Sequence, residues 1–330
     1  MIDIQSAINE LSNKTDNRTS VFEIEVQGLK NSTLTLSGRV LHESQLDELR
    51  QLLPLLKLNL NAVRILGREP GEQVHVATTL TGLYEKPTFG QRRASELTFG
   101  TGLEVLDVEN QWVFARQRDG YLGWVYRLYL SQEAAPQGTH LVVIPATEVL
   151  AQPGDACEVV TRLVSGTAVR VEEKVDGWSR ITANHSGWIL TRYLRAMNDL
   201  PVTLEQKRLT LVEDAKRMLG VPYLWGGTSG NGIDCSGFVR LLHRYIGIEA
   251  PRDADMQYAA AHPVEPPYEA GDLFFFKGGE DGRNITHVGM SLGGWNMIHS
   301  SRRNNGVYID NLQEQASLIS TFVSAGSFLR

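Results

Sequence analysis

The sequence predicts a multidomain chain: a small α/β domain, two small β-barrels and a C-terminal α+β domain, in that order. Three observations support this prediction. The chain has 330 residues, which is long for a single domain. The pattern G-W-[VI]-x-x-x-Y-L occurs twice, ending at Leu130 and at Leu194. After the second copy, helical spacing of apolar residues precedes several strand-like segments, an order typical of α+β domains.

Composition excludes several classes of function. The net charge is −6, so the chain has no basic surface of the kind that nucleic acid partners require. No stretch of about 18 apolar residues is present, which argues against a membrane span. The first twenty residues lack the basic start and apolar middle of a secretion signal, so we expect a cytoplasmic protein. The two cysteines are too few for a disulfide framework or a four-cysteine zinc site.

Residues 1–71 are expected to form the small α/β domain. A short helix is predicted near Ile4–Leu11, and a second helix that Pro54 should end or kink. Alternation of apolar and polar residues predicts strands at 21–29 and 32–41, with a third at 61–66. The order helix–strand–strand–helix–strand resembles the BON-type domain, which implies a stabilising or interaction role.

The repeated pattern marks two β-rich units, which we place at residues 72–133 and 138–198. Each contains short strands and Gly-rich turns, which favours a small barrel. The G-W-[VI] ending resembles bacterial SH3-like domains. The tryptophans of these units are expected in the barrel cores, namely Trp112, Trp124, Trp178 and Trp188. Cys157 has no histidine nearby in the sequence and is interpreted as structural.

The last domain is predicted to span residues 204–330. It begins with an amphipathic helix that Gly220 should cap. Four later segments read as antiparallel strands, at 272–277, 286–292, 296–301 and 306–312. A chain reversal at Gly293–Trp295 would make the strands that carry His287 and His299 neighbours.

A lone cysteine, Cys235, follows the Gly-rich segment that begins "YLWGGTSGNG", where the pattern changes from loop to helix. Asp234 or Ser236 would cap this helix. Unpaired N–H groups and the helix dipole should lower the thiol pKa, which favours a nucleophile. Its base would be His287 or His299.

Other interpretations remain open for each of these residues. A free cysteine often packs as a small apolar residue, and a strand histidine is often structural. His243, on the helix after Cys235, is expected to be a surface or packing residue. A zinc site built from Cys235, His287 and His299 is a third interpretation, although the close ligand spacing of zinc motifs is missing.

Taken together, "PYLWGG", "DCSGFV", "PRD", "GDLFFF", "HVGM" and "IHSS" occur in order within about 80 residues. This combination resembles the NlpC-type papain-like cysteine peptidases, which hydrolyse peptidoglycan stem peptides. With two SH3-like units upstream, the chain is similar to the γ-D-glutamyl-L-diamino acid endopeptidases of murein-peptide recycling. The resemblance implies Cys235 as nucleophile, His287 as general base, His299 as the residue that orients it, and no cofactor or metal. It also implies that Tyr223 helps to position the substrate.

The substrate that the resemblance implies is L-Ala-γ-D-Glu joined to a diamino acid. Asp253 matches an acidic residue near the substrate amine, and Ser236 matches a hydroxyl that contacts D-Glu. Asp234 and Trp225 match further wall residues. Where relatives often have Ser, this chain has Ala254, so one hydrogen bond to D-Glu is replaced or absent, with Arg252 as the candidate replacement.

In this family the first SH3-like unit closes the far end of the pocket. Tyr121 matches the tyrosine that does so, and Glu85 the acid, with Glu96 as the second choice. Closure would restrict the enzyme to peptides with a free N-terminal L-Ala. Two other functions stay open: a murein-peptide-binding module without turnover, and a papain-like amidase or acyl transferase that acts on another amide.

Overall fold

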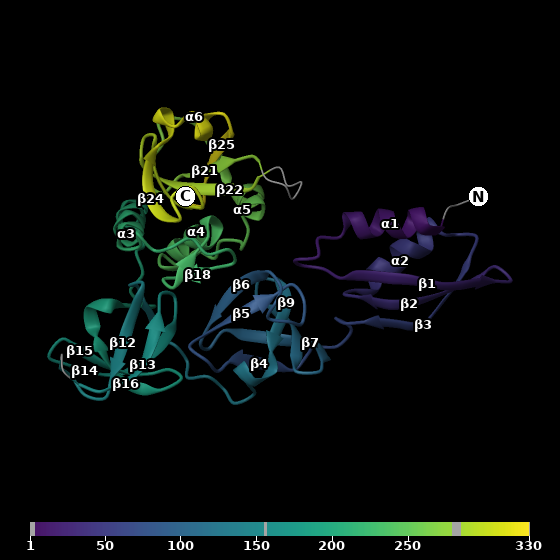
Figure 1. Ribbon diagram of the computed structural model, residues 1–330, viewed down its shortest axis with the longest axis horizontal. Helices are drawn as coiled ribbons and strands as arrows, with labels where there is room; N and C mark the ends of the chain where they lie inside the picture. The colour runs from purple at the N-terminus through teal and green to yellow at the C-terminus, as the bar shows by residue number, and fades with distance from the viewer. Residues whose placement is uncertain (1–3, 155–156, 279–284, 330) are drawn as a thin grey trace. The chain divides into compact units, whose positions relative to one another are not determined.

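The computed structural model describes residues 4–154, 157–278 and 285–329 (Figure 1). The chain forms two compact units. The first comprises Met1–Val74, Lys86–Phe89 and Gly102–Leu128, and the second comprises His75–Glu85, Gly90–Thr101 and Tyr129–Arg330. The strands of the first predicted barrel are therefore divided between the units, and the four domain boundaries stay a prediction. Among the described residues, no helix combines the length and apolar character needed to cross a membrane.

The first unit begins with the predicted order helix–strand–strand–helix–strand. Its elements are α1 (Ile4–Lys14), β1 (Phe22–Lys30), β2 (Thr33–Val40), α2 (Glu43–Leu52) and β3 (Lys57–Ile65). The central strand β2 pairs antiparallel with β1 and parallel with β3. Helix α2 ends before Pro54, as expected from the missing N–H of proline. Apolar residues of both helices and the sheet form one buried cluster.

Ion pairs join this sheet to a three-stranded meander in the same unit. The meander consists of β7 (Gly102–Glu109), β8 (Trp112–Gln117) and β9 (Leu122–Tyr126). Asp107 of β7 accepts hydrogen bonds from Arg39 and Arg64. The Arg39 guanidinium also lies 5.6 Å from the ring centre of Trp124. Trp112 and Trp124 are buried, as the sequence predicted.

The second unit contains a hairpin and the second barrel. The first strands are β4 (Gln73–Val76, which spans the unit boundary), β5 (Leu80–Tyr84), β6 (Arg93–Thr98) and β10 (Leu130–Ser131). The barrel strands are β11 (His140–Val142), β12 (Ala146–Leu150), β13 (Val159–Val164), β14 (Ala168–Val175), β15 (Trp178–Thr182), β16 (Ser186–Leu190) and β17 (Leu194–Ala196). The prediction of core positions for Trp178 and Trp188 is wrong, since both are half-buried. Alternation along β15 and β16 gives the inward positions to Ser179, Ile181 and Ile189 instead.

The C-terminal part of this unit combines helices with a six-stranded sheet. Its helices are α3 (Leu204–Arg217), α4 (Cys235–Arg244), α5 (Ala254–Ala260) and α6 (Ala316–Ile319). Helices α3 and α4 lie on one face of the sheet, whereas Leu318 of α6 packs into a cluster on the other face. The sheet order is β20 (His262–Val264), β25 (Phe322–Ser327), β21 (Leu273–Phe276), β22 (His287–Gly293), β23 (Asn296–Ser301) and β24 (Gly306–Asn311). The predicted reversal at Gly293–Trp295 is confirmed, because β22 and β23 pair antiparallel. Strands β20 and β25 were not predicted.

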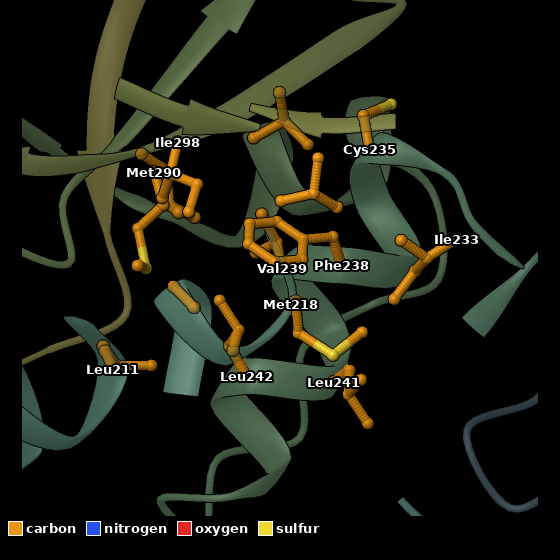
Figure 2. Packing of buried hydrophobic residues seen from close by; sticks show 14 of the residues in the cluster. Leu211, Met218, Ile233, Cys235, Phe238, Val239, Leu241, Leu242, Met290 and Ile298 are labelled. Atoms are coloured by element: carbon orange, nitrogen blue, oxygen red, sulfur yellow. The ribbon is translucent and has the colours of Figure 1, made fainter. Parts of the chain in front are cut away.

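The sheet is buried on both faces at β21. Phe275 packs into the cluster that includes α3 and α4, whereas Phe274 and Phe276 pack into a second cluster on the opposite face. Figure 2 shows Phe238 and Val239 of α4 within the first cluster and Cys235 at its edge. The nucleophile candidate is thus held by the best-packed helix of the domain.

The second barrel packs directly against this helical face. The Tyr245 hydroxyl, just after α4, donates to the carbonyl of Val142 at 3.0 Å. Arg195 of β17 forms two hydrogen bonds to Asp214 of α3, at 2.5 and 3.1 Å. A side chain at Gly230 would lie 2.1 Å from the carbonyl oxygen of Pro145, so glycine permits the close approach of the two backbones.

Replacement of Asp214 by Ala should destabilise this unit. The Asp214 side chain is 1% exposed and that of Arg195 is 17% exposed, so the substitution leaves a largely buried guanidinium without its carboxylate. We expect a loss of about 2–4 kcal/mol in the free energy of unfolding, measured by urea denaturation followed by tryptophan fluorescence. Glu148→Ala is the matched control, since its pair with Arg162 is exposed and is worth under about 1 kcal/mol. Equal losses in both variants would show that the buried Arg195–Asp214 ion pair does not stabilise this unit more than an exposed pair does.

Candidate active site

The segment before α4 is a short hairpin that fixes where the helix begins. Tyr223 bridges to Ile233, and the hairpin strands β18 (Thr228–Ser229) and β19 (Gly232–Ile233) follow. Asp234 is the N-cap of α4, as predicted, and its Oδ1 accepts from the N–H of Gly237 at 2.7 Å. Cys235 is therefore the first helical residue, where N–H groups have no partner within the helix.

Asp234 is also the centre of a buried polar network. Arg252 donates to both of its carboxylate oxygens, at 2.6 and 3.1 Å. The same guanidinium donates to Ser236 and, from Nε, to Ser95 of β6, each at 3.0 Å. Arg252 is 2% exposed and Asp234 is 6% exposed. Three residues predicted to contact substrate thus bond to one another in the protein interior.

The two acids considered for the substrate amine occupy different environments. The Glu96 side chain is buried, pairs with Arg93, and accepts from the N–H of Thr228 and the hydroxyl of Ser229 at 3.1 and 2.9 Å. Burial raises its pKa above the usual carboxyl value, although these hydrogen bonds oppose the shift. Glu85 is exposed at the end of β5. Glu96 therefore connects β6 to the β18 segment, and Glu85 is the acid that is open to solvent.

His287, His299 and a third residue form a chain of hydrogen bonds across three strands. His287 Nε2 lies 2.7 Å from His299 Nδ1, and His299 Nε2 lies 3.0 Å from Asp310 Oδ2. The hydrogen bond from His299 lowers the pKa of Asp310, so this carboxylate is ionised and accepts. A neutral His299 then donates from Nε2 and accepts at Nδ1. His287 therefore donates from Nε2 and keeps the lone pair on Nδ1.

Asp310 was not identified from the sequence. Its role depends on the pairing of β23 with β24, in which His299 lies opposite Tyr308. Residues two positions apart on a strand share a face, so Asp310 lies diagonally from His299 on the same face. The sequence shows an acidic residue in the strand "GVYIDNL". Its position beside His299 can be recognised only when the register between β23 and β24 is known.

Gly289 allows the histidines to approach each other. It lies on β22, two residues after His287 and on the same face. A Cβ atom there would be 3.1 Å from the Cβ of His299 and 2.3 Å from the sulfur of Met297. A larger residue would displace side chains of β23, so steric fit explains why glycine occupies this position of "HVGM".

The expectation of a lowered thiol pKa is not met. Burial raises the pKa of Cys235 to about 12, and the nearby Asp234 carboxylate adds to the shift. Hydrogen bonds from the N–H groups of Val288 and Ser236 act in the opposite direction. Burial and His299 lower the pKa of His287 to about 3. Thus desolvation outweighs the hydrogen bonds that favour the thiolate, and the pair rests as a neutral thiol and a neutral imidazole.

Cys235 and both histidines line one cleft of about 800 Å³. Tyr223 and Trp225 form part of its wall. Burial raises the pKa of the Tyr223 hydroxyl, which therefore stays protonated and can donate. The guanidinium of Arg92, from the β5–β6 hairpin, lies 3.8 Å from the ring centre of Trp225.

The remaining predicted residues are not among those that line this cleft. Asp253 is the N-cap residue of α5, and its carboxylate does not cap that helix. Tyr121 belongs to the first unit, in the turn before β9, where its carbonyl accepts from the N–H of Gln117. His243 is fully buried, which confirms the packing interpretation and not the surface one. Its pKa falls to about 4 because of burial.

The zinc interpretation does not fit the hydrogen bonds. Both nitrogens of His299 are occupied, one by His287 and one by Asp310. In the part of the chain that the structure describes, no group of three or more His, Cys, Asp or Glu residues is arranged to hold a metal ion.

Alkylation kinetics test the neutral resting pair. In a Cys157→Ser protein, Cys235 is the remaining cysteine. Because the thiolate is the reactive form, we expect iodoacetamide to modify it slowly at about pH 6, at a rate that still rises at about pH 9. Mass spectrometry measures the adduct. As a control, a Cys235→Ala protein gives the alkylation rate of the half-buried Cys157. A rate already at its plateau near pH 6 would reveal a preformed thiolate–imidazolium pair instead.

Three segments match described domain families. Residues 220–324 match the NlpC/P60 family, residues 83–127 match the bacterial dipeptidyl-peptidase SH3 domain, and residues 145–195 match the bacterial SH3 domain. None of these ranges includes residues 1–71, so the BON-like resemblance stays a prediction.

Curated relatives and a solved structure match about two thirds to three quarters of the chain. A γ-D-glutamyl-L-lysine dipeptidyl-peptidase of Bacillus subtilis is 29% identical over 67% of this chain and 76% of its own length. Dipeptidyl-peptidase 6 of Lysinibacillus sphaericus is 26% identical over 74% of this chain and 93% of its own length. A solved NlpC/P60 family protein of Bacillus cereus has the same fold, with a TM-score of 0.66 and 23% identity over 78% of this chain and all of that one. The chain therefore carries an NlpC/P60 cysteine peptidase domain and two bacterial SH3 domains.

Proposed function

We propose that this peptidase hydrolyses the bond between γ-D-Glu and the diamino acid of murein stem peptides. The observation that carries the proposal is the hydrogen-bonded series from His287 through His299 to Asp310, beside Cys235 in one cleft. Relatives named γ-D-glutamyl-L-lysine dipeptidyl-peptidases, from Bacillus cereus and Bacillus subtilis, match about two thirds of the chain and support the substrate class.

The reaction begins when the Cys235 thiol transfers its proton to Nδ1 of His287 as sulfur attacks the γ-carbonyl carbon. The developing oxyanion can accept hydrogen bonds from the Cys235 N–H and the Tyr223 hydroxyl. When the C–N bond breaks, His287 returns this proton to the leaving amine. Water, deprotonated by the same imidazole, then hydrolyses the thioester and releases the dipeptide.

Proton transfer within the attack step suits a neutral pair. An ionised thiolate and imidazolium would both be desolvated in this buried position, at considerable cost. The neutral groups avoid that cost until the substrate carbonyl is present. His299 and Asp310 then stabilise the imidazolium that forms, because the carboxylate lies at the end of the hydrogen-bonded series.

For the dipeptide side of the substrate, we propose that Asp253 and Glu85 bind the L-Ala ammonium and that Trp225 forms a wall. Arg92, on the same hairpin as Glu85, lines the cleft, and the N–H of Glu85 donates to its carbonyl. This contact supports Glu85 over Glu96. Ser236 and Arg252 would act mainly through the network around Asp234.

We further propose a role in recycling, with a requirement for a free N-terminal L-Ala. L-Ala-γ-D-Glu-diaminopimelate should be cleaved, and the same peptide acetylated on its alanine should not, because acetylation removes the ammonium. Mass spectrometry of the products measures both reactions, with Cys235→Ala as the inactive control. Cleavage of both peptides would keep the peptidase and refute the amine requirement. Cleavage of neither would refute the proposed substrate.

Asp310→Asn tests whether Asp310 orients His299 and, through it, His287. The asparagine amide can donate to His299 Nε2, which reverses both tautomers and places a proton on His287 Nδ1. We expect kcat to fall by about 10²- to 10⁴-fold, while KM and the urea midpoint change little. The matched control is Glu314→Gln, an exposed acid of the 3-10 turn Leu312–Glu314 that does not line the cleft.

The pH profile separates the two explanations of such a loss. If the substitution reverses the histidine tautomers, kcat should be lower at every pH. If it only makes the site less ordered, KM should rise instead. If kcat changes by less than about threefold, Asp310 does not orient the histidines.

A further inference from the structure

The side of the cleft that receives the leaving residue can be assigned from the proposed chemistry. His287 returns its proton to the leaving amine, so the diamino acid lies next to His287. The Phe276 ring lies 5.5 Å from that of His287 and lines the cleft, as do Lys277 and, on α6, Ser317 and Leu318. The leaving residue therefore contacts this part of the lining.

Positive charge dominates the lining residues that the structure describes. They include four cationic side chains, namely Arg92, Lys277, Arg302 and Arg303, and one acidic side chain, Asp310. The Asp310 carboxylate is already bonded to His299. A ligand with additional negative charge is therefore favoured in this cleft.

Arg302 and Arg303 have uncharged hydrogen-bond and ring partners. Arg303 donates to the Gln315 amide oxygen at 2.8 Å and to the Ser317 hydroxyl at 3.3 Å, both neutral acceptors. Besides the hydrogen bond from His299, the charge of Arg303 also lowers the pKa of Asp310. The Arg302 guanidinium lies 4.7 Å from the ring centre of Trp225 and 5.6 Å from that of Tyr223. Aromatic faces orient a guanidinium without neutralising it.

The two diamino acids of stem peptides differ in the charge that they bring here. As the C-terminal residue, lysine carries one carboxylate and one ammonium. Diaminopimelate carries the same two groups and a second carboxylate at the end of its side chain. Guanidinium forks bind carboxylates through paired hydrogen bonds, which a lysine side chain cannot accept.

We propose that Arg303, which is held by the α6 segment, binds the second carboxylate of a diaminopimelate leaving residue, so that the enzyme selects this diamino acid over lysine. The inference rests on the proposed function and extends it to the third residue of the peptide. It assigns to this chain a preference that differs from the lysine in the names of its relatives.

The test compares L-Ala-γ-D-Glu-meso-diaminopimelate with L-Ala-γ-D-Glu-L-lysine. We expect kcat/KM to be roughly three- to tenfold higher for the diaminopimelate peptide, the range that one or two partly exposed ion pairs provide. The preference should shrink as ionic strength rises, because salt screens exposed charges. Arg303→Gln should reduce the ratio toward one.

Arg192→Gln is the matched control. This arginine is also exposed and lies 5.3 Å from the ring centre of a tyrosine, Tyr193, but it is not in the cleft lining. It should leave the ratio unchanged. Equal kcat/KM values for the two peptides in the wild-type protein would overturn the inference and leave the proposed function intact. Equal effects of Arg192→Gln and Arg303→Gln would also overturn it. Cleavage of neither peptide would overturn the proposed function and the inference together.

Discussion

The geometry of the site depends on the buried ion pair between Asp234 and Arg252. Two buried charges are costly unless each finds well-placed partners. Here the guanidinium binds the carboxylate through two hydrogen bonds, and the carboxylate also accepts from the N–H groups of Gly226 and Gly237. One carboxylate thus fixes the loop before the nucleophile, the start of α4 and the entry to α5. The position of Cys235 follows from these constraints.

The sheet supplies the second constraint. His287, His299 and Asp310 come from three adjacent strands, and their contacts require each strand to keep its register. A slip of one residue would turn a histidine to the opposite face and break the hydrogen-bonded series. Burial of β21 on both faces opposes such slips, because Phe274 and Phe275 fill different clusters. Packing of the core thus preserves the strand register, and with it the hydrogen bonds among His287, His299 and Asp310.

Local patterns in the sequence indicated Cys235, His287 and His299 as candidates, because each lies in a short motif and the motifs occur in a fixed order. The structure brings all three to one cleft. The same patterns indicated β22, β23 and the turn between them. Asp310 was missed because its contact with His299 arises from the register of β23 and β24. The thiol pKa was misjudged for a related reason. The start of a helix is visible in the sequence, whereas the burial that raises the thiol pKa arises from tertiary packing.

The β5–β6 hairpin shows how an SH3-like strand pair becomes part of a peptidase domain. Ser95 bonds to Arg252, Glu96 bonds to the hairpin before α4, and Arg92 lies against Trp225. Two of these contacts are buried and hold the nucleophile loop, and the third lines the cleft. Substitutions at Ser95 or Glu96 would therefore alter the stability of the loop, and a substitution at Arg92 would alter the charge of the cleft. Because the same strand pair contributes to both properties, the charge of the cleft is coupled to the packing that positions Cys235.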